Sequence, residues 1–148
     1  MPHAVLVLNG PNLNLLGRRE PGIYGATSLA DVEAMCVAEG RRLDLEVACR
    51  QSNYEGELVT WVQEVAGHYA GLVINPGAYT HTSVALHDAL RTLEEPIIEI
   101  HLSNIHQRES FRHQSYVSLV AKGVICGLGT KGYTLALEGL ADILTRTT

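Results

Sequence analysis

Short apolar runs alternate with amphipathic segments along the whole chain, and this alternation limits the possible fold more than any other feature. The apolar runs are expected to be strands, and the segments with apolar residues at helical spacing are expected to be helices. Parallel strands need a long connection between them, and helices in those connections cover both faces of the sheet. The alternation therefore predicts an α/β protein with a parallel sheet.

Five segments are expected to be strands: residues 4–8, 45–49, 72–74, 97–101 and 124–126. Thr27 or Ser28 should cap the first helix, and Pro96 separates a later helix from the fourth strand. A shorter polar helix is expected around residues 105–111, and the second strand is expected at an edge of the sheet. The whole predicts a flavodoxin-like three-layer sandwich with a five-stranded parallel sheet, in one catalytic domain over residues 1–148.

The composition excludes several classes of protein. Apolar residues make up 46% of the 148 residues and the net charge is −5, so a nucleic-acid partner is not expected. The three cysteines are widely spaced without a C-x-x-C pair, which favours a reduced chain. Since neither a signal peptide nor a run of membrane-spanning length is apparent, we expect a cytoplasmic protein with no membrane partner.

Polar side chains follow four of the expected strands at the point where each strand ends. Because the carboxyl ends of parallel strands meet at one edge of a sheet, these side chains are expected to converge on a crevice for a small ligand. Any single Asn among them could equally be a turn residue, so the prediction depends on the cluster. The cluster consists of Asn9, Asn12, Gln51, Ser52, Asn53, Asn75, His101 and Ser103.

The loop after the first strand brings two guanidinium groups close in sequence to a phenol. Arg18 and Arg19 precede Tyr24 by a few residues. A permanent positive charge nearby favours the tyrosinate form. This combination predicts a catalytic base.

Glu99 and His101 interrupt an apolar strand and, being two residues apart, point to the same face. Glu99 could fix the tautomer of His101 and stabilise its imidazolium, which suits a general acid. The alternative is a structural pair. Arg108 and Arg112 would share one face of a helix and could hold a carboxylate or several hydroxyls, although a solvated charged face is an equal alternative.

Other signals do not lead to a cofactor. Residues 127–132 match G-x-G-x-x-G, but they follow the last strand and no further strand remains to supply a ribose-binding acid. The histidines lack compact metal-ligand spacing, and no P-loop or nucleophile elbow is present. A flavin- or nucleotide-binding module of the same fold stays open as the alternative function, and a noncatalytic assembly protein is a weaker one.

Five sequence motifs resemble those of the type II 3-dehydroquinate dehydratases, over about residues 5–144. They are L-N-G-P-N-L-N-L-L-G from residue 8, R-E-P-x-x-Y-G from residue 19, Q-S-N-x-E-G from residue 51, N-P-G-A-Y-T-H from residue 75 and E-x-H-L-S-N from residue 99. The resemblance implies a flavodoxin-like fold, no cofactor and a homododecamer made of four trimers. It also implies loss of water from 3-dehydroquinate, giving 3-dehydroshikimate, in the shikimate pathway or in quinate catabolism.

The same resemblance implies a role for each matching residue. Tyr24 is similar to the base that removes the proton beside the ketone, Arg19 holds it as phenolate, and Asn12 helps an enolate through a bound water. His101, oriented by Glu99, is similar to the acid that protonates the leaving hydroxyl. The implied substrate-binding residues are Asn75, His81, Leu102, Ser103 and Arg112, with Asp88 presented to the site of a neighbouring subunit.

The residues agree with an elimination that is not covalent. Removal of a proton beside a ketone gives an enolate, whose charge has to be met by positioned donors such as the amides of the crevice. A Schiff base would need a lysine in the site. The two lysines, Lys122 and Lys131, flank the fifth strand instead.

Overall fold

The computed structural model describes residues 1–18, 22 and 26–146. Its sheet has five strands in the order β2-β1-β3-β4-β5, and every neighbouring pair is parallel. This order is that of flavodoxin-like folds. The predicted fold class is therefore confirmed, and so is the edge position of the second strand. The strands are β1 (His3–Asn9), β2 (Leu45–Gln51), β3 (Gly71–Asn75), β4 (Ile97–His101) and β5 (Gly123–Cys126).

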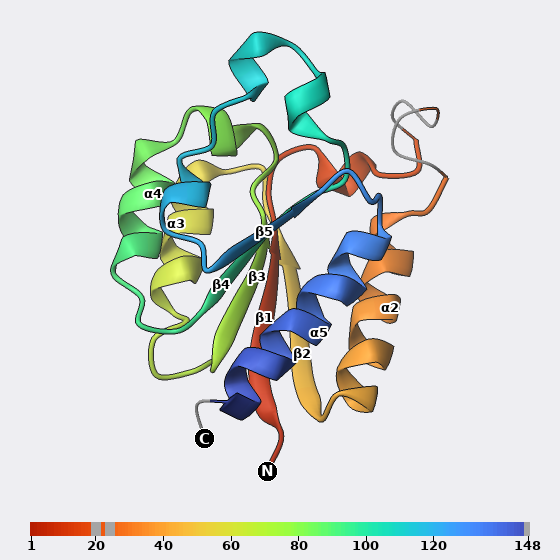
Figure 1. Cartoon of the computed structure of the whole chain (residues 1–148), viewed down its shortest axis with the longest axis vertical. Coiled ribbons are helices and arrows are strands. Elements are labelled where there is room, and N and C mark those ends of the chain that lie inside the picture. The colour runs from red at the N-terminus through yellow and green to blue at the C-terminus, as the bar shows by residue number, and fades with distance from the viewer. Residues whose placement is uncertain (19–21, 23–25, 147–148) are drawn as a thin grey trace.

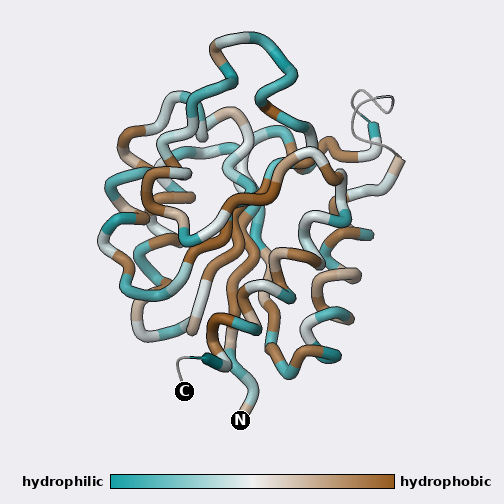
Figure 2. Tube along the Cα trace, in the orientation of Figure 1, coloured by the Kyte–Doolittle hydropathy of each residue, from teal (hydrophilic) through white to brown (hydrophobic). Residues whose placement is uncertain are grey.

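Within the described residues, four α-helices cover the two faces of the sheet. They are α2 (Leu29–Arg42), α3 (Glu55–Gln63), α4 (Val84–Arg91) and α5 (Lys131–Arg146). Helices α2 and α5 lie on one face, and α3 and α4 lie on the other (Figure 1). The central strands are strongly apolar along their length, as the brown tube in the middle of Figure 2 shows. The predicted three layers are present.

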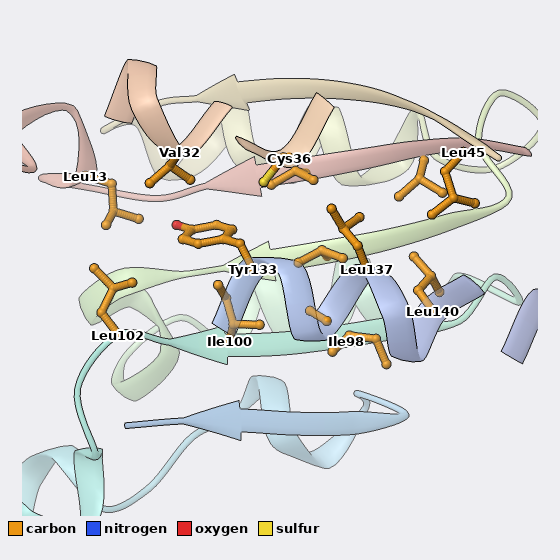
Figure 3. Close-up of a cluster of buried hydrophobic side chains, with 14 of the residues drawn as sticks. Leu13, Val32, Cys36, Leu45, Ile98, Ile100, Leu102, Tyr133, Leu137 and Leu140 are labelled. Carbon is orange, nitrogen blue, oxygen red and sulfur yellow. The ribbon is translucent and has the colours of Figure 1, made fainter. Parts of the chain in front are cut away.

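The period of a β-strand divides the core into two apolar clusters. Val5 and Val7 of β1 belong to the cluster under α2 and α5, whereas Leu6 and Leu8 belong to the cluster under α3 and α4. Tyr133 of α5 lies among the side chains of the first cluster (Figure 3). Since the central strands are buried on both faces, they are apolar in nearly every position.

Two local features define where α2 starts and how closely the loops after β1 and β3 approach each other. Ser28, one of the two predicted caps, accepts a hydrogen bond from the backbone of Asp31, and Asp31 returns one to the backbone of Ser28, so the two form a capping box for α2. The loops after β1 and β3 touch at Gly10, where a Cβ atom would lie 2.5 Å from the carbonyl oxygen of Pro76. Only glycine allows this approach.

The prediction of one helix around residues 105–111 is wrong. Two short 3₁₀-helices are present instead, η3 (Ile105–Gln107) and η4 (Ser110–Arg112), with Arg108 in an extended conformation between them. Ile105 is the one buried residue in these two turns, so the segment has too little apolar surface to bury one face of a longer helix. Arg108 and Arg112 therefore do not share a helix face.

His81 and Asp88 are seven residues apart but do not share a helix. His81 ends the 3₁₀-helix η2 (Gly77–His81), and α4 begins only at Val84. Ser83 accepts a hydrogen bond from the backbone of Leu86 and starts the new helix there. In the described part of the chain, no helix combines the length and the apolar character needed to cross a membrane.

Candidate active site

A cavity of about 110 Å³ lies where β1, β3 and β4 end. A single bound water needs about 10–15 Å³, so this cavity admits a small organic molecule. Asn12, Asn75, His81 and His101 line it. Asn12 follows β1, Asn75 and His101 are the last residues of β3 and β4, and His81 ends η2. The carboxyl edge of the sheet is where ligands bind in open α/β folds, as predicted.

Polar residues at the ends of β1 and β2 hold the loop after β1 in place beside this cavity. The backbone N–H of Asn12 donates to Oδ1 of Asn53 at 3.0 Å, and Nε2 of Gln51 donates to the carbonyl of Gly10 at 3.1 Å. Asn12 itself has a φ of 70°, in the left-handed region that Asn tolerates. Half of the predicted polar cluster reaches the cavity: Asn12, Asn75, His101 and Ser103 line it, whereas Asn9, Gln51, Ser52 and Asn53 do not.

Below the cavity, Tyr133 connects the ends of β1 and β3. Its hydroxyl donates to Oδ1 of Asn9 at 2.5 Å and accepts from Nδ2 of Asn75 at 3.0 Å. Burial raises the pKa of Tyr133, which keeps the phenol protonated and able to donate. Oδ1 of Asn75 accepts from the backbone of Gly77, so the orientation of this cavity-lining amide is fixed on both sides.

Tyr133→Phe is expected to lower the free energy of unfolding by about 2–4 kcal/mol, because it leaves buried groups of Asn9 and Asn75 without a partner. We also expect a higher KM, since Asn75 loses one of the bonds that orient it. Urea unfolding measures the first effect. Tyr69→Phe is the matched control, since it removes the same atom from a partly buried tyrosine, and an equal loss in both variants would contradict the assignment.

Glu99 and His101 form the pair that the sequence predicted. Both are buried, and Nε2 of His101 lies 2.5 Å from Oε2 of Glu99. An ionised carboxylate only accepts hydrogen bonds, so Nε2 carries a proton and Nδ1 is the nitrogen that can gain or lose one. His101 lines the cavity and Glu99 lies behind it. This is the geometry of a general acid with its orienting carboxylate.

The carboxyl group of Glu99 stays ionised although it is buried. Burial, the largest influence, raises its pKa, but hydrogen bonds from His101 and Ser118 outweigh burial and leave the pKa below the ordinary value of 4.5. Ser115 also donates to this carboxylate. A group with a depressed pKa in the folded state stabilises the fold above its unfolded pKa, and the contribution disappears as the pH falls through the folded value.

The lowered pKa of Glu99 predicts how the free energy of unfolding depends on pH. Glu99→Gln is expected to cost about 3 kcal/mol of unfolding free energy near pH 7, because it breaks a buried pair. The difference from the unmodified chain should shrink as the pH falls below 4.5. Urea unfolding of both proteins between pH 7 and pH 3 measures this. A difference that does not change with pH would show that Glu99 is not ionised in the folded protein.

His81 contributes a neutral imidazole to the cavity. Burial lowers its pKa, the hydrogen bond to the backbone of Gln114 opposes this, and the charges of His101 and Arg112 lower it further. Its Nδ1 lies 2.8 Å from the carbonyl of Gln114 and must therefore donate to it. In the neutral ring, Nε2 is then an acceptor, which suits a hydroxyl of a bound substrate.

Arg108 and Arg112 place positive charge on one side of the cavity, although they are not on one helix. Leu102 and Ser103 line the cavity as well. A guanidinium nitrogen of Arg108 donates to Oγ of Ser103 at 3.3 Å, and Nε of Arg112 donates to Glu109 at 2.8 Å. Nε of Arg108 also lies 3.9 Å from Oε1 of Glu109, so one carboxylate is placed beside both guanidinium groups. The predicted substrate-binding residues Leu102, Ser103 and Arg112 are thus brought together with Asn75 and His81 at one cavity.

Three predicted residues are not placed there. Arg19 and Tyr24 lie outside the described residues. Asp88 is exposed on α4, where it bonds to Nδ1 of His87 at 2.9 Å, and it does not line this cavity. Its expected role at a neighbouring subunit's site stays a prediction.

Sequence reasoning missed the hydroxyls around Glu99, which come from Thr80, Ser115 and Ser118. A buried carboxylate requires donors, so a search for nearby Ser and Thr could have suggested candidates. Their distance along the chain from Glu99 hides which ones are used. The apolar lining was also missed, and it consists of Pro11, Leu13, Leu16, Ala78 and Ile105.

The G-x-G-x-x-G segment has a structural role. The backbone N–H of Gly127 donates to the carbonyl of His101 at 3.2 Å, and that of Gly129 donates to Leu102 at 3.0 Å. These amides are therefore not available to a phosphate, which disfavours the nucleotide-binding alternative. Within residues 1–18, 22 and 26–146, no group of three or more His, Cys, Asp or Glu side chains could hold a metal ion.

Comparison with known proteins decides the family. A model of the family "Dehydroquinase class II" matches residues 3–141. The chain belongs to the class II dehydroquinases. A curated relative from Brucella canis, named 3-dehydroquinate dehydratase, is 59% identical over 143 residues, which cover 97% of this chain and 91% of the relative. The resemblance drawn from the motifs is confirmed.

Solved structures agree with this class II dehydroquinase over almost its whole length. The type II dehydroquinase from Propionibacterium acnes has a TM-score of 0.93 and 49% identity, covering 96% of this chain and 98% of that one. The enzyme from Butyrivibrio crossotus has a TM-score of 0.91 and 44% identity, covering 94% and 97%. The whole fold of this chain is therefore that of the type II dehydroquinases.

Proposed function

We propose that this class II dehydroquinase removes water from 3-dehydroquinate through an enolate, without a cofactor and without a covalent intermediate. Its activity is that of a hydro-lyase, 3-dehydroquinate dehydratase, and the reaction belongs to the shikimate pathway; quinate catabolism uses the same step. One observation carries the mechanism. A buried carboxylate fixes the tautomer of His101 at the wall of the cavity.

The first step is the removal of the proton beside the substrate ketone, which we assign to Tyr24 as phenolate. A tyrosine with an ordinary pKa near 10 is only about 0.1% ionised at pH 7, so the base needs a partner that favours the anion. Arg19 is the proposed partner, because its guanidinium is charged at every working pH. The C–H electron pair moves to the ketone oxygen and forms the enolate.

In the second step the enolate re-forms the ketone. The electron pair of its carbon–carbon double bond forms the new double bond to the neighbouring carbon, and the hydroxyl on that carbon leaves. His101 gives its Nδ1 proton to the departing oxygen, which leaves as water, and Glu99 stabilises the imidazolium before that transfer. Asn12, which lines the cavity, is proposed to meet the enolate charge through a bound water. The proton taken by Tyr24 and the proton given by His101 balance the elimination.

The cavity also suits the substrate as an anion with several hydroxyl groups. Arg112 supplies positive charge, while His81, Asn75 and Ser103 supply donors and acceptors at fixed positions. Leu102 contributes apolar surface beside the ring. These are the residues that the resemblance implies for substrate binding, and each lines the cavity.

The proposed assembly is a homododecamer of four trimers, each copy being one catalytic domain, in the cytoplasm. Its support is the family resemblance together with exposed groups on α4, where Asp88 lies near Val84, an apolar side chain that is 53% exposed. In the assembly, Asp88 would reach the site of a neighbouring copy. Light scattering should give a mass of twelve chains, and a monomer would contradict the proposal.

The activity is tested by following the ultraviolet absorbance of the conjugated enone after 3-dehydroquinate is added to the purified protein. Dehydration creates the carbon–carbon double bond beside the ketone, so absorbance should rise. Borohydride treatment in the presence of substrate should leave the rate unchanged, because no imine is formed. Absence of enone formation would reject the function, and inactivation by borohydride would reject the noncovalent route.

A further inference from the structure

Three hydroxyl groups surround the carboxylate of Glu99 on the side away from the substrate cavity. Oγ of Ser118 donates to Oε1 at 2.6 Å, and Oγ of Ser115 donates to Oε2 at 2.8 Å. Thr80 lies 2.7 Å from Oγ of Ser115 and 3.3 Å from Oε2. With His101 on Oε2, both carboxylate oxygens are occupied.

The single proton of each hydroxyl decides how this cluster is connected. Ser115 gives its proton to Glu99, so at the shorter of the two distances Thr80 donates to Ser115. Oγ of Ser115 also accepts from the backbone N–H of Ser118 at 3.2 Å. Thr80 and the Ser118 backbone therefore orient Ser115, while Ser115 and Ser118 contact the carboxylate directly.

These donors are neutral and do not depend on the protonation state of His101. When His101 gives up its acidic proton, Glu99 loses the attraction of a positive charge inside a buried environment, where an unpaired carboxylate is costly. Two hydroxyl bonds remain at that stage. The carboxylate can stay ionised, and Nε2 can keep its proton, throughout the reaction cycle.

The surroundings leave few other groups that could take over this task. Glu99 is paired with Ile74 of β3 and Val124 of β5, which are both apolar. Among the described residues, the titratable groups that interact with its charge are His101 on its own strand and His81 of η2. Neither histidine reaches Oε1, which Ser118 contacts.

We propose that Ser115 and Ser118 are positioning residues of the dehydratase, whose hydroxyls hold Glu99 as a carboxylate so that His101 presents Nδ1 to the leaving hydroxyl. The proposal rests on the proposed function of His101. Ser118 is the better residue to change, because it is exposed in the 3₁₀-helix η5 (Val117–Leu119) and its truncation creates no cavity in the core.

The decisive measurement is the titration of the Glu99 carboxyl, followed by NMR of the ¹³C-labelled side chain in Ser118→Ala and in the unmodified protein. Loss of a hydrogen bond to a charged group should raise the pKa of Glu99 by about one unit. At neutral pH, kcat should fall with little change in KM, because Glu99 orients His101 less well. Ser115→Ala combined with Ser118→Ala should raise the pKa of Glu99 further.

Two control variants separate positioning from a structural role. Ser118→Thr keeps the hydroxyl and should restore the titration of Glu99, whereas Ser110→Ala removes an exposed hydroxyl on η4 and should leave it unchanged. An unshifted titration in Ser118→Ala overturns the proposal. A lower Tm and a lower rate with an unchanged titration of Glu99 also overturn it, because this is the result of a structural role alone.

A second readout does not require activity. The difference in unfolding free energy between Ser118→Ala and the unmodified chain should be present at neutral pH and should vanish at low pH, where Glu99 is protonated. If the unmodified protein forms no enone, the proposed function fails, and this unfolding difference still tests the contact. A difference independent of pH would reject the hydroxyl contact to an ionised Glu99.

Discussion

His101→Ala is expected to lower kcat by about 10²–10⁴-fold, which is the usual contribution of a positioned general acid. KM should change much less, because the other residues of the cavity remain. The variant should still take the proton beside the ketone, since the proposed base is a different residue. In D₂O, NMR should therefore show exchange of that substrate proton with almost no formation of enone.

His68→Ala is the matched control for this variant. His68 is exposed in the turn before β3, at the opposite edge of the sheet, and Nδ1 of its ring contacts the backbone carbonyls of Glu64 and Ala66. Its replacement should leave both exchange and elimination unchanged. A full rate in His101→Ala would reject the assignment of the acid, and loss of exchange together with elimination would show that His101 acts before the enolate is formed.

Tyr24→Phe is expected to remove nearly all turnover, by about 10³-fold or more, because the phenolate is the only base proposed for the first step. Product should bind with little change in affinity, since the aromatic ring is retained. Unlike His101→Ala, this variant should lose proton exchange in D₂O as well as elimination. Together, the two variants assign the base and the acid to separate steps.

The control for Tyr24→Phe is Tyr54→Phe, because Tyr54 is 75% exposed and does not line the cavity. This change removes the same hydroxyl oxygen at an exposed position away from the cavity. Near-normal rate in Tyr24→Phe would refute the assigned base. Arg19→Gln should resemble Tyr24→Phe at neutral pH and recover part of its rate at high pH, where the phenol ionises without help.

Much of the fold could be predicted, because it depends on the period of the apolar residues. The runs at Ala4 to Leu8 and Ile97 to Ile100 are apolar in almost every position, since each strand is buried on both faces. The cap predicted at Thr27 or Ser28 does start α2, at Ser28. The helix expected around residues 105–111 is absent, because this polar segment has one buried side chain and forms two separate turns.

The candidate site was predictable in part for a similar reason. Asn75 and His101 end their strands, and the carboxyl ends of parallel strands must meet. Arg108 and Arg112 were predicted to act together from one helix, which the structure does not contain. Both still line the cavity, because the turns η3 and η4 lie beside it. Tyr133 was not predicted as part of the site, because its hydroxyl reaches Asn9 only across the core.

The sequence by itself determined the α/β fold, the parallel sheet and the pair of Glu99 and His101, because these follow from periods and spacings of a few residues along one strand or helix. Only the tertiary structure decided which donors meet the buried carboxylate and which residues support the cavity. Ser115 and Ser118 are 16 and 19 residues from Glu99 along the chain. Such partners are selected by the packing of separate elements around a charge that must not be left unpaired, and local sequence patterns carry no record of that packing.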